Sequence, residues 1–573
     1  MLKRHPQIVA ILGIVFLLGL ANGCATKVEP ADLVVTNGKI VTMDAILPQA
    51  EALAVRGGKI VEVGKAKKIG RYVGPATEVI DLGGKLAVPG LIDSHLHFQG
   101  IGQAKLSLDL TKVKSWEEIV AMVAETVKTV KSGEWITGRG WHQEKWNKRP
   151  EPNVNGLPLH DALSKVSPDN PVVLTHASGH SSLTNAKAMA LANITAKTPN
   201  PSGGEIIKDA KGRPIGAFLE TAQGLIRGGR PRGQATRTPA EIEAQQMKII
   251  DLADKECLSK GLTSVHDAGV GWSTVELYKK AIDESKIGVR LNVMLSTDNK
   301  QLQEKAAEYR LIGYGADHLT VRSIKRLIDG ALGSHGAWLL EPYSDLPASS
   351  GLNTASVESL KETARIAIEN GFQLGVHAIG DRANRETLNI YEEAMKAHPD
   401  KKDIRWRVEH AQHLSSADIP RFGGLGVIAA MQGIHCTSDG PWVPMKLGAK
   451  RAEEGAYVWR KLISSGAVIS NGTDAPVEDV DPIPSFYASV TRKMKNGETF
   501  YPDQKMTREE ALRSYTLNGA YASFEETIKG SLAAGKLADI TVLSKDILTC
   551  PEEEILSAQI IYTIVGGKVL YKK

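Results

Sequence analysis

The chain has 573 residues, too many for one small core, and its hydrophobic (42%) and charged (24%) contents are those of an ordinary globular protein. Its formal net charge of +5 arises from basic residues interleaved with acidic ones. This excludes the basic block typical of nucleic-acid binding, so no nucleic-acid partner is expected. The four cysteines have neither CxxC nor zinc-finger spacing, which argues against a disulfide framework.

The N-terminal 24 residues have the pattern of a targeting signal. Lys3 and Arg4 form a positive start, and residues 8–20 form an apolar stretch too short to span a membrane comfortably. Small residues then lead to Cys24, as in a bacterial lipoprotein signal; a plain secretory signal with a chance cysteine is the alternative. We therefore expect export, with a lipid anchor on Cys24 at the periplasmic side of the cell envelope, and at the outer membrane if the host is Gram-negative.

Both ends of the mature chain predict short strands joined by tight turns. Residues 31–85 contain the turn pairs Asn-Gly and Gly-Gly, which supply the positive φ that hairpins need. The same pattern of short strands and tight turns is present near the C-terminus in LADITVLS and IIYTIVGGKVLYKK. We predict one small β-sandwich domain built from residues 31–90 and 529–573.

The central segment, residues 91–528, alternates strands with helices, which predicts an α/β fold of the (β/α)8 TIM-barrel type. Helix starts are marked by the capping boxes Thr238-x-x-Glu241 and Thr507-x-x-Glu510, and a further helix is expected to end before Gly371. The candidate strands end near His97, His266, Ser296, Ile328, His377, His410, Met431 and Asp474.

An insertion over about residues 110–235 interrupts this alternation. It contains an amphipathic helix that begins after Ser115, whose apolar stripe includes Trp116, Ile119 and Val123. It also contains the Gly/Pro/Arg-rich run RGGRPRGQATRTP, best interpreted as a solvated loop. We expect a subdomain over the barrel mouth that supplies substrate contacts.

Side chains suited to metal binding recur where these strands end. His95 and His97 lie two residues apart and so share one face of the first strand, although two hydrogen-bonded polar residues would fit the same spacing. Because a TIM barrel places its active site at the carboxyl ends of its strands, the candidates converge on one rim. They are His95, His97, Lys325, His377, His410 and Asp474. Imidazole and carboxylate ligands suit a divalent metal, zinc first, as one or two ions.

These residues resemble a known family. The pattern HxH, strand-four Lys, strand-five His, strand-six His and strand-eight Asp resembles the amidohydrolase superfamily. Finer motifs resemble its YtcJ-like branch, amidohydrolase family 3, which includes N-substituted formamide deformylase. They are GRGW (138–141), GHSSLTN (179–185), DGALGSHGAWLLEPYSD (329–345), HAIGDRA (377–383), VEHAQH (408–413) and TDAPVEDVDP (473–482). His142, and His335 with Gly336, depart from the residues usual in that branch. Both positions are expected to touch substrate or support the rim, so the departures leave the substrate open.

The roles of the candidate residues follow from chemistry and from this resemblance. A carboxylate beside a metal stays ionised, so Asp474 is the expected general base, with a helix N-cap as the alternative. The resemblance implies that Lys325 could be carboxylated and bridge two metals; otherwise it is a structural lysine paired with an acid such as Asp329. Glu220 is a competing metal ligand, or else an ordinary surface glutamate. His180 could stabilise an oxyanion or orient the substrate, or be a polar loop residue without a role. Trp141 and His335 are expected to contact substrate, with packing alone as the alternative for a buried tryptophan.

The predicted function is metal-dependent hydrolysis of an amide-type C–N bond in a small molecule. The alternatives are another electrophile (a cyclic imide, an ester or a deaminated ring) and a lipid-anchored protein that binds metal or ligand without turnover. The oligomeric state stays open, with a homodimer as one option.

Overall fold

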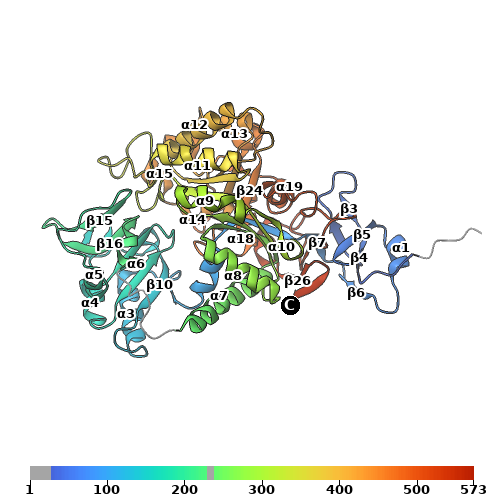
Figure 1. Cartoon of the computed structure of the whole chain (residues 1–573), viewed down its shortest axis with the longest axis horizontal. Coiled ribbons are helices and arrows are strands. Elements are labelled where there is room, and N and C mark those ends of the chain that lie inside the picture. The colour runs from blue at the N-terminus through green and yellow to red at the C-terminus, as the bar shows by residue number, and fades with distance from the viewer. Residues whose placement is uncertain (1–27, 229–237) are drawn as a thin grey trace, which may run out of the picture.

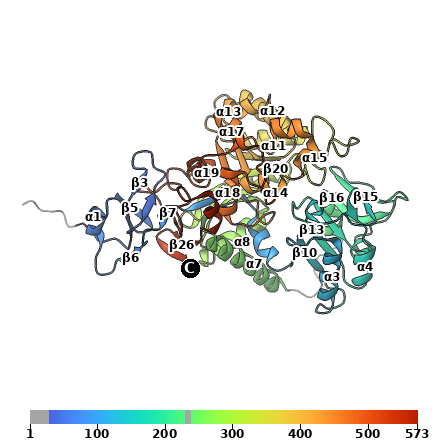
Figure 2. The same cartoon turned by 180° about the vertical axis from the view of Figure 1, so that it is seen from behind.

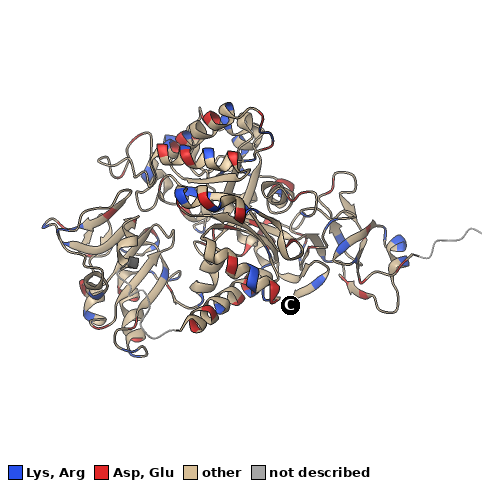
Figure 3. Ribbon diagram, in the orientation of Figure 1, with Lys and Arg blue, Asp and Glu red and all other residues tan. Residues whose placement is uncertain are grey.

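A computed structural model describes residues 28–228 and 238–573, so Cys24 and the signal segment lie outside the described residues. The terminal sheets lie at one end of the molecule and the insertion at the other, with a barrel between them (Figures 1 and 2). Basic and acidic residues are interspersed along the outer helices (Figure 3). A search of the described helices finds none long and apolar enough to cross a membrane.

The central sheet is a barrel of parallel strands. In spatial order the strands are β24 (Ile469–Gly472), β23 (Ile428–Gln432), β22 (Arg407–His410), β21 (Gln373–Ala378), β20 (Leu319–Leu327), β18 (Arg290–Leu295), β17 (Leu262–Val270) and β8 (Leu91–Leu96). The backbone N–H of Asp474, just after β24, donates to the carbonyl of His95 on β8 at 2.8 Å and so links the first and last strands. The predicted (β/α)8 fold class is confirmed, and the predicted strand ends fall close to those observed.

Helices follow or separate these strands. They are α2 (Phe98–Ala104), α7 (Pro239–Ser259), α8 (Trp272–Asp283), α9 (Asn299–Tyr309), α10 (Tyr314–Asp317), α11 (Val357–Glu369), α12 (Asp381–Ala397), α13 (Ile419–Leu425), α14 (Gly433–Asp439), α15 (Val443–Leu447), α16 (Ala449–Gly455), α17 (Trp459–Ser464), α18 (Pro482–Thr491), α19 (Arg508–Ser514) and α20 (Leu517–Ala522), with the short strand β19 (Leu311–Gly313) and the 3₁₀ helix η3 (Pro502–Gln504). Both predicted capping boxes form, at the starts of α7 and α19. Helix α11 ends before Gly371, whose φ of 68° suits a C-terminal stop.

The two ends of the described chain form two further sheets, the first from N-terminal strands alone and the second from both ends. One runs β5 (Lys59–Gly64), β4 (Ala52–Arg56), β1 (Leu33–Thr36), β6 (Glu78–Asp81). The other runs β27 (Lys568–Lys572), β26 (Ile560–Val565), β25 (Ile540–Leu543), β7 (Leu86–Pro89), β2 (Lys39–Val41), β3 (Gln49–Ala50), and short helices α1 (Ala66–Ile69), η1 (Gly70–Tyr72) and η4 (Glu552–Ser557) accompany them. Apolar residues of both sheets, among them Val35, Leu53 and Ile540, form one buried cluster, as in a β-sandwich.

The insertion has its own sheet and core. The sheet runs β15 (Gly204–Lys208), β16 (Pro214–Glu220), β14 (Ser181–Thr184), β13 (Val172–His176), β10 (Ile136–Trp141), β9 (Leu108–Asp109). The hairpin β11 (Asn153–Val154) and β12 (Leu157–Pro158) and the helices α3 (Trp116–Val127), η2 (Gln143–Lys145), α4 (Asp161–Val166), α5 (Ala186–Leu191) and α6 (Gln223–Gly228) complete it. Helix α3 is the predicted amphipathic helix: Ser115 caps it, and Trp116, Ile119 and Val123 are buried.

Candidate active site

His95, His410 and Asp474 form a compact cluster at the carboxyl end of the barrel. Each offers one ligand atom, and these atoms all lie within 4.8 Å of one another. Their side chains project from the ends of β8 and β22 and from the turn after β24, and all three residues are buried. Residues more than three hundred positions apart therefore meet at one point, as the strand-end argument predicts.

The turn that carries Asp474 is held against β8. The buried carboxylate of Asp93 accepts hydrogen bonds from the Thr473 backbone N–H (3.0 Å) and hydroxyl (2.6 Å). A Cβ on Gly472 would lie 2.6 Å from the Asp93 carboxylate and from the His95 nitrogen. Only glycine permits this approach, which explains the Asn-Gly-Thr-Asp sequence at the strand end.

Two polar partners orient the clustered imidazoles. His95 Nδ1 contacts the carboxylate of Glu409, and His410 Nδ1 lies 2.8 Å from Gln432 Oε1. Because a carboxylate or amide oxygen can only accept, each Nδ1 carries the proton and each Nε2 keeps its lone pair. This is the arrangement expected of metal-binding histidines, whose outer ring nitrogen is fixed by a hydrogen-bond acceptor.

Buried polar atoms in and beside the cluster lack hydrogen-bond partners, as expected where a divalent metal would bind. His95 Nε2, His377 Nε2 and Asp474 Oδ1 are buried without a hydrogen-bond partner in the described part of the chain. Burial, together with Lys325, lowers the pKa of His95 to about 4 against the pull of Glu409, so this imidazole is neutral at pH 7. Burial would raise the pKa of Asp474, but the neighbouring histidines hold it well below its usual range. Neutral imidazoles beside an ionised carboxylate are the donor set that zinc and related ions take.

His97 and His377 flank this cluster. His97 is the N-cap of α2; its side chain is 42% exposed, and its Nε2 lies 3.4 Å from Asp474 Oδ1. The His377 and His410 ring centroids are 4.5 Å apart, and His377 Nε2 lies 3.6 Å from Asp329 Oδ1. The structure therefore brings both predicted histidines to the cluster.

Lys325 on β20 points to the same site. It is 3% exposed, and burial lowers its pKa against the attraction of Glu409 and Asp474. Among the described residues Lys325 forms no ion pair with Asp329, whose carboxylate instead accepts from backbone N–H groups. These belong to Trp338, Ile379 and Gly380. Carboxylation of Lys325 stays a prediction.

Glu220 and His180 bring the insertion over the barrel mouth. Glu220 ends β16 and its Oε2 accepts from His180 Nδ1 at 2.7 Å, so it is a buried partner rather than a surface residue. The rings of His180 and His377 are 4.9 Å apart. A Cβ on Gly330 or Gly336 would lie 2.0 or 2.4 Å from Glu220 Oε1. These glycines in the DGALGSHG stretch thus let the carboxylate enter the site.

Two predicted substrate contacts lie elsewhere. Trp141 is fully buried in the core of the insertion and donates from Nε1 to the Leu174 carbonyl at 2.8 Å, so its prediction as a pocket wall is wrong. His335 does not line the pocket beside the cluster; its Nε2 lies 3.0 Å from Asp345 and 3.1 Å from Lys446 Nζ. It lines an adjacent cavity.

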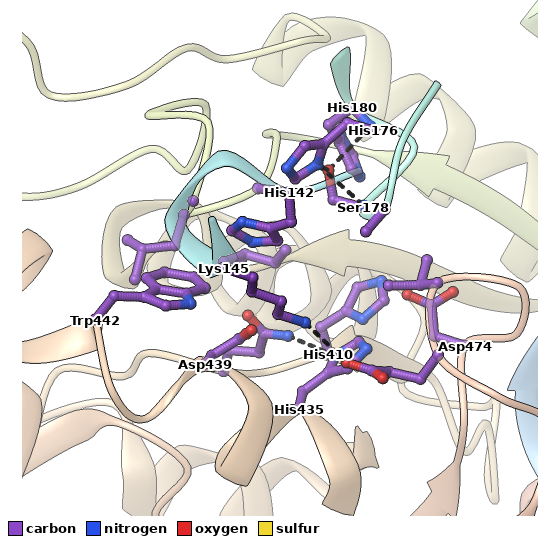
Figure 4. Close-up of a pocket in the computed structure, with 18 of the residues that line it drawn as sticks. His142, Lys145, His176, Ser178, His180, His410, His435, Asp439, Trp442 and Asp474 are labelled. Atoms are coloured by element: carbon purple, nitrogen blue, oxygen red, sulfur yellow. Dashed lines mark hydrogen bonds and ion pairs between the residues drawn. The ribbon is translucent and has the colours of Figure 1, made fainter. Parts of the chain in front are cut away.

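Beside His180 and the candidate metal ligands, the pocket is lined by residues from the insertion and the barrel loops; of these the sequence analysis singled out only His142, as a residue that touches substrate or supports the rim (Figure 4). From the insertion these are His142, Lys145, His176 and Ser178, and from the barrel loops Gln412, His435, Asp439, Trp442 and Glu478. One signal was present: His142 directly follows the GRGW motif, and the next residue along an extended chain faces the opposite side from Trp141.

Comparison with known proteins identifies relatives over most of the chain. A family model described as "Amidohydrolase family" matches residues 78–571. The chain is 34% identical to Protein LONG AFTER FAR-RED 3 of Arabidopsis thaliana, over 94% of this chain and 92% of that protein. It is 32% identical to the putative amidohydrolase YtcJ of Bacillus subtilis (94% and 98%) and 28% identical to the N-substituted formamide deformylase of Arthrobacter pascens (95% and 98%).

Solved structures show the same architecture. An uncharacterized metal-dependent hydrolase from Pyrococcus furiosus superimposes with a TM-score of 0.69 at 28% identity, covering 90% of this chain and all of that one. A second, from Pyrococcus horikoshii, gives a TM-score of 0.71 at 26% identity, with 91% and 99% covered.

Proposed function

This chain belongs to the amidohydrolase family and is a metal-dependent hydrolase of carbon–nitrogen bonds, and on that premise we propose that it cleaves an amide-type bond of a small molecule with Asp474 as the general base. The observation that carries the proposal is the cluster of His95, His410 and Asp474, with His377 beside it. An N-substituted formamide is the substrate class to test first, because the Arthrobacter pascens relative is named for that reaction.

His95, His410 and Asp474 would hold the metal, with His97 and His377 within reach. The metal, when bound, makes a water molecule acidic enough to supply hydroxide near neutral pH. Zinc is the ion we propose, and Lys325, if carboxylated, would be a further residue able to hold a metal. Glu220 is the competing ligand: His180 occupies its Oε2, whereas its buried Oε1 has no hydrogen-bond partner in the described part of the chain.

Asp474 would move the proton. Its carboxylate is ionised at neutral pH and is buried beside the imidazoles, so it can accept a proton from water as the C–O bond forms. The same carboxyl then delivers that proton to the leaving nitrogen as the C–N bond breaks, and Asp474 returns to its starting state.

His180 would stabilise the carbonyl oxygen during this attack. Burial alone would lower its pKa, but the adjacent Glu220 carboxylate outweighs burial and raises the pKa. Since His180 Nδ1 donates to Glu220, a second proton on Nε2 is free to donate toward the pocket. An oxygen that gains negative charge would be stabilised by this donor.

The test compares zinc-loaded wild type with Asp474→Asn on a panel of N-substituted formamides, with bound metal quantified in both. We expect kcat to fall by roughly 10³-fold, the range for loss of a general base. Asp479→Asn, which changes an exposed carboxylate five positions along, should leave kcat unchanged. Equal turnover by wild type and Asp474→Asn at equal metal content would refute the proposed mechanism.

We also propose export and lipid anchoring through Cys24. The support is the sequence alone: a basic start, a short apolar stretch and small residues before the cysteine. In a bacterial host, wild type should partition with membranes, and Cys24→Ala should release the protein or leave its signal uncleaved. Soluble wild type with an intact N-terminus would contradict the proposal.

A further inference from the structure

The outer half of the pocket has a wall of nitrogen-bearing rings that the proposed mechanism does not use. His142, His176 and His435 are 7%, 1% and 5% exposed, and Trp442 is 7% exposed. Buried nitrogen atoms of three of these rings have no hydrogen-bond partner within residues 28–228 and 238–573; they are His176 Nε2, His435 Nε2 and Trp442 Nε1. Figure 4 shows all four rings around one cavity with His410 and Asp474.

Each of the four rings carries an N–H group that can donate a hydrogen bond. The Ser178 backbone N–H donates to His176 Nδ1 at 3.1 Å, so the single proton of this neutral, buried imidazole lies on Nε2. The Glu144 backbone N–H donates to His142 Nδ1 at 3.3 Å, which fixes the same tautomer. Burial lowers the pKa of both His142 and His176 well below the usual value, so neither ring is charged at neutral pH.

The two remaining rings follow the same rule. The Gln412 amide nitrogen donates to His435 Nδ1 at 3.0 Å, which again leaves the proton on Nε2. Trp442 can only donate, because an indole nitrogen has no free lone pair. A pocket wall of buried, unpaired N–H groups is costly unless a ligand accepts from it.

The rings form one side of the cavity. The ring centroids of His142 lie 4.4 Å from His176 and 5.6 Å from Trp442. His435 is stacked near His410, with centroids 6.4 Å apart and planes 17° apart. The donors therefore extend from the outer pocket toward the metal-binding histidines, and the ring faces offer a surface for a planar group.

The charged residues of the pocket argue against an anionic ligand. Lys145 Nζ lies 3.7 Å from Glu478 Oε1, so its positive charge is already neutralised by an ion pair. Asp439 adds a second carboxylate, which accepts from the Tyr457 hydroxyl at 2.8 Å. The acceptors at this rim are thus occupied, and the acids would repel a carboxylate on the substrate.

We propose that this pocket binds a neutral, planar group that carries hydrogen-bond acceptors, such as a carbonyl oxygen or an aromatic ring nitrogen. The group belongs to the part of the substrate beyond the scissile bond; this inference rests on the proposed function and specifies its substrate class. The unpaired N–H groups of His176, His435 and Trp442 supply the recognition.

The experiment compares three formamides of similar size with zinc-loaded enzyme: N-(4-isopropylbenzyl)formamide, N-(4-acetylbenzyl)formamide and N-(4-carboxybenzyl)formamide. We expect kcat/KM to be about tenfold higher for the acetyl compound than for the other two, the effect of one added hydrogen bond. His176→Phe and Trp442→Phe keep an aromatic ring but remove the N–H, so each should reduce that ratio toward one. Trp272→Phe, on α8 away from the pocket, should not change it.

Direct calorimetric binding of the same compounds separates the two proposals. Tighter binding of the acetyl compound without turnover of any of the three would support this inference and refute the proposed function for this substrate class. Equal kcat/KM or equal affinity for the acetyl and isopropyl compounds would overturn the inference, whether or not turnover occurs. Preference for the carboxylate would also overturn it, since that result requires an anion site.

Discussion

Glu409 on β22 holds His95 on β8 through the imidazole Nδ1, and both residues are fully buried. The guanidinium of Arg407 binds the same carboxylate from Nε at 2.7 Å and from Nη2 at 2.9 Å. Arg407 and His95 outweigh burial, so the pKa of Glu409 lies well below its usual range and the carboxylate stays ionised. Glu409 thereby fixes which nitrogen of His95 faces the metal cluster.

Glu409→Gln should weaken metal binding without removing a metal ligand. We expect the affinity to fall by about 10- to 100-fold, because the imidazole loses the carboxylate that orients it and makes it more basic. A chromophoric chelator in competition with the protein measures this affinity. The exposed Glu393→Gln on α12 is the control and should bind metal as wild type does. Unchanged affinity in folded Glu409→Gln would mean that the contact is only structural.

Loss of the Glu409 charge could also unfold the protein, since Arg407 is buried beside it. Gln432→Leu tests the same principle at His410 without leaving a charge unpaired, because it removes a neutral acceptor of similar size. It should also lower metal affinity, by a smaller factor. Wild-type affinity in both folded variants would argue against orientation by these partners.

Chelation should destabilise the folded protein. A ligand that binds only the native state at a thousandfold excess over its Kd adds about 4 kcal/mol to the free energy of unfolding. We therefore expect the Tm of zinc-loaded wild type to fall when a chelator is added. Asp474→Asn should show a smaller fall, because one residue of the cluster is changed. A Tm insensitive to the chelator in fully loaded wild type would contradict a metal bound at this cluster.

The barrel and its metal-binding side chains were predictable because both depend on regular strands. Short apolar runs mark the strands, and the fold fixes where their carboxyl ends meet. His95, His410 and Asp474 could thus be grouped before any coordinates were known. Glu409 was not singled out, although it is adjacent to His410, because nothing in its local sequence shows that it faces His95 across the barrel.

The outer pocket could not be predicted in the same way. His142 and His176 come from the insertion, whereas His435 and Trp442 come from barrel loops. These segments follow no common spacing, and they meet only once the insertion has folded over the barrel. His142, expected to touch substrate or support the rim, does line this pocket, whereas strand alternation directs Trp141, expected as a pocket wall, into the insertion's core.

Lys446→Met should loosen the contact between the insertion and the barrel. The Lys446 side chain is 2% exposed, and its Nζ lies 2.9 Å from Asp345 and 3.3 Å from Glu144 of the insertion. Both acids retain some contact with solvent, so we expect a loss of about 1–3 kcal/mol, less than for a fully buried pair. Thermal unfolding measures this loss of stability, and faster hydrogen exchange around Glu144 would show that it arises at the contact with the insertion.

The exposed lysine Lys450 provides the control for this substitution. It lies on α16, is 85% exposed and approaches Glu454 only to 4.0 Å. Lys450→Met should change the free energy of unfolding by less than about 0.5 kcal/mol, as is usual for surface sites. If both variants lose the same stability, the buried pairs of Lys446 do not join the two parts.

Asp254→Asn should stabilise the protein in a pH-dependent way. Asp254 on α7 is 7% exposed, and its Oδ1 accepts from the backbone N–H groups of Gly288 (2.8 Å) and Val289 (2.9 Å). Burial raises its pKa to about 6, against these hydrogen bonds, so the folded state binds a proton more tightly than the unfolded chain. Stability therefore falls as the pH rises from about 4 to about 6, by up to about 3 kcal/mol.

An asparagine at position 254 keeps the accepting oxygen but cannot ionise, so it removes this penalty. Relative to wild type, Asp254→Asn should have a similar Tm near pH 4 and a higher Tm at pH 7–8. The half-exposed Glu243→Gln, on the same helix but not among the charges that shift the Asp254 pKa, should not show this pH-dependent difference. A constant Tm difference between Asp254→Asn and wild type across this pH range would contradict the prediction. It would mean that the Asp254 carboxyl has the same pKa in the folded and unfolded chain, so that its burial has no electrostatic cost.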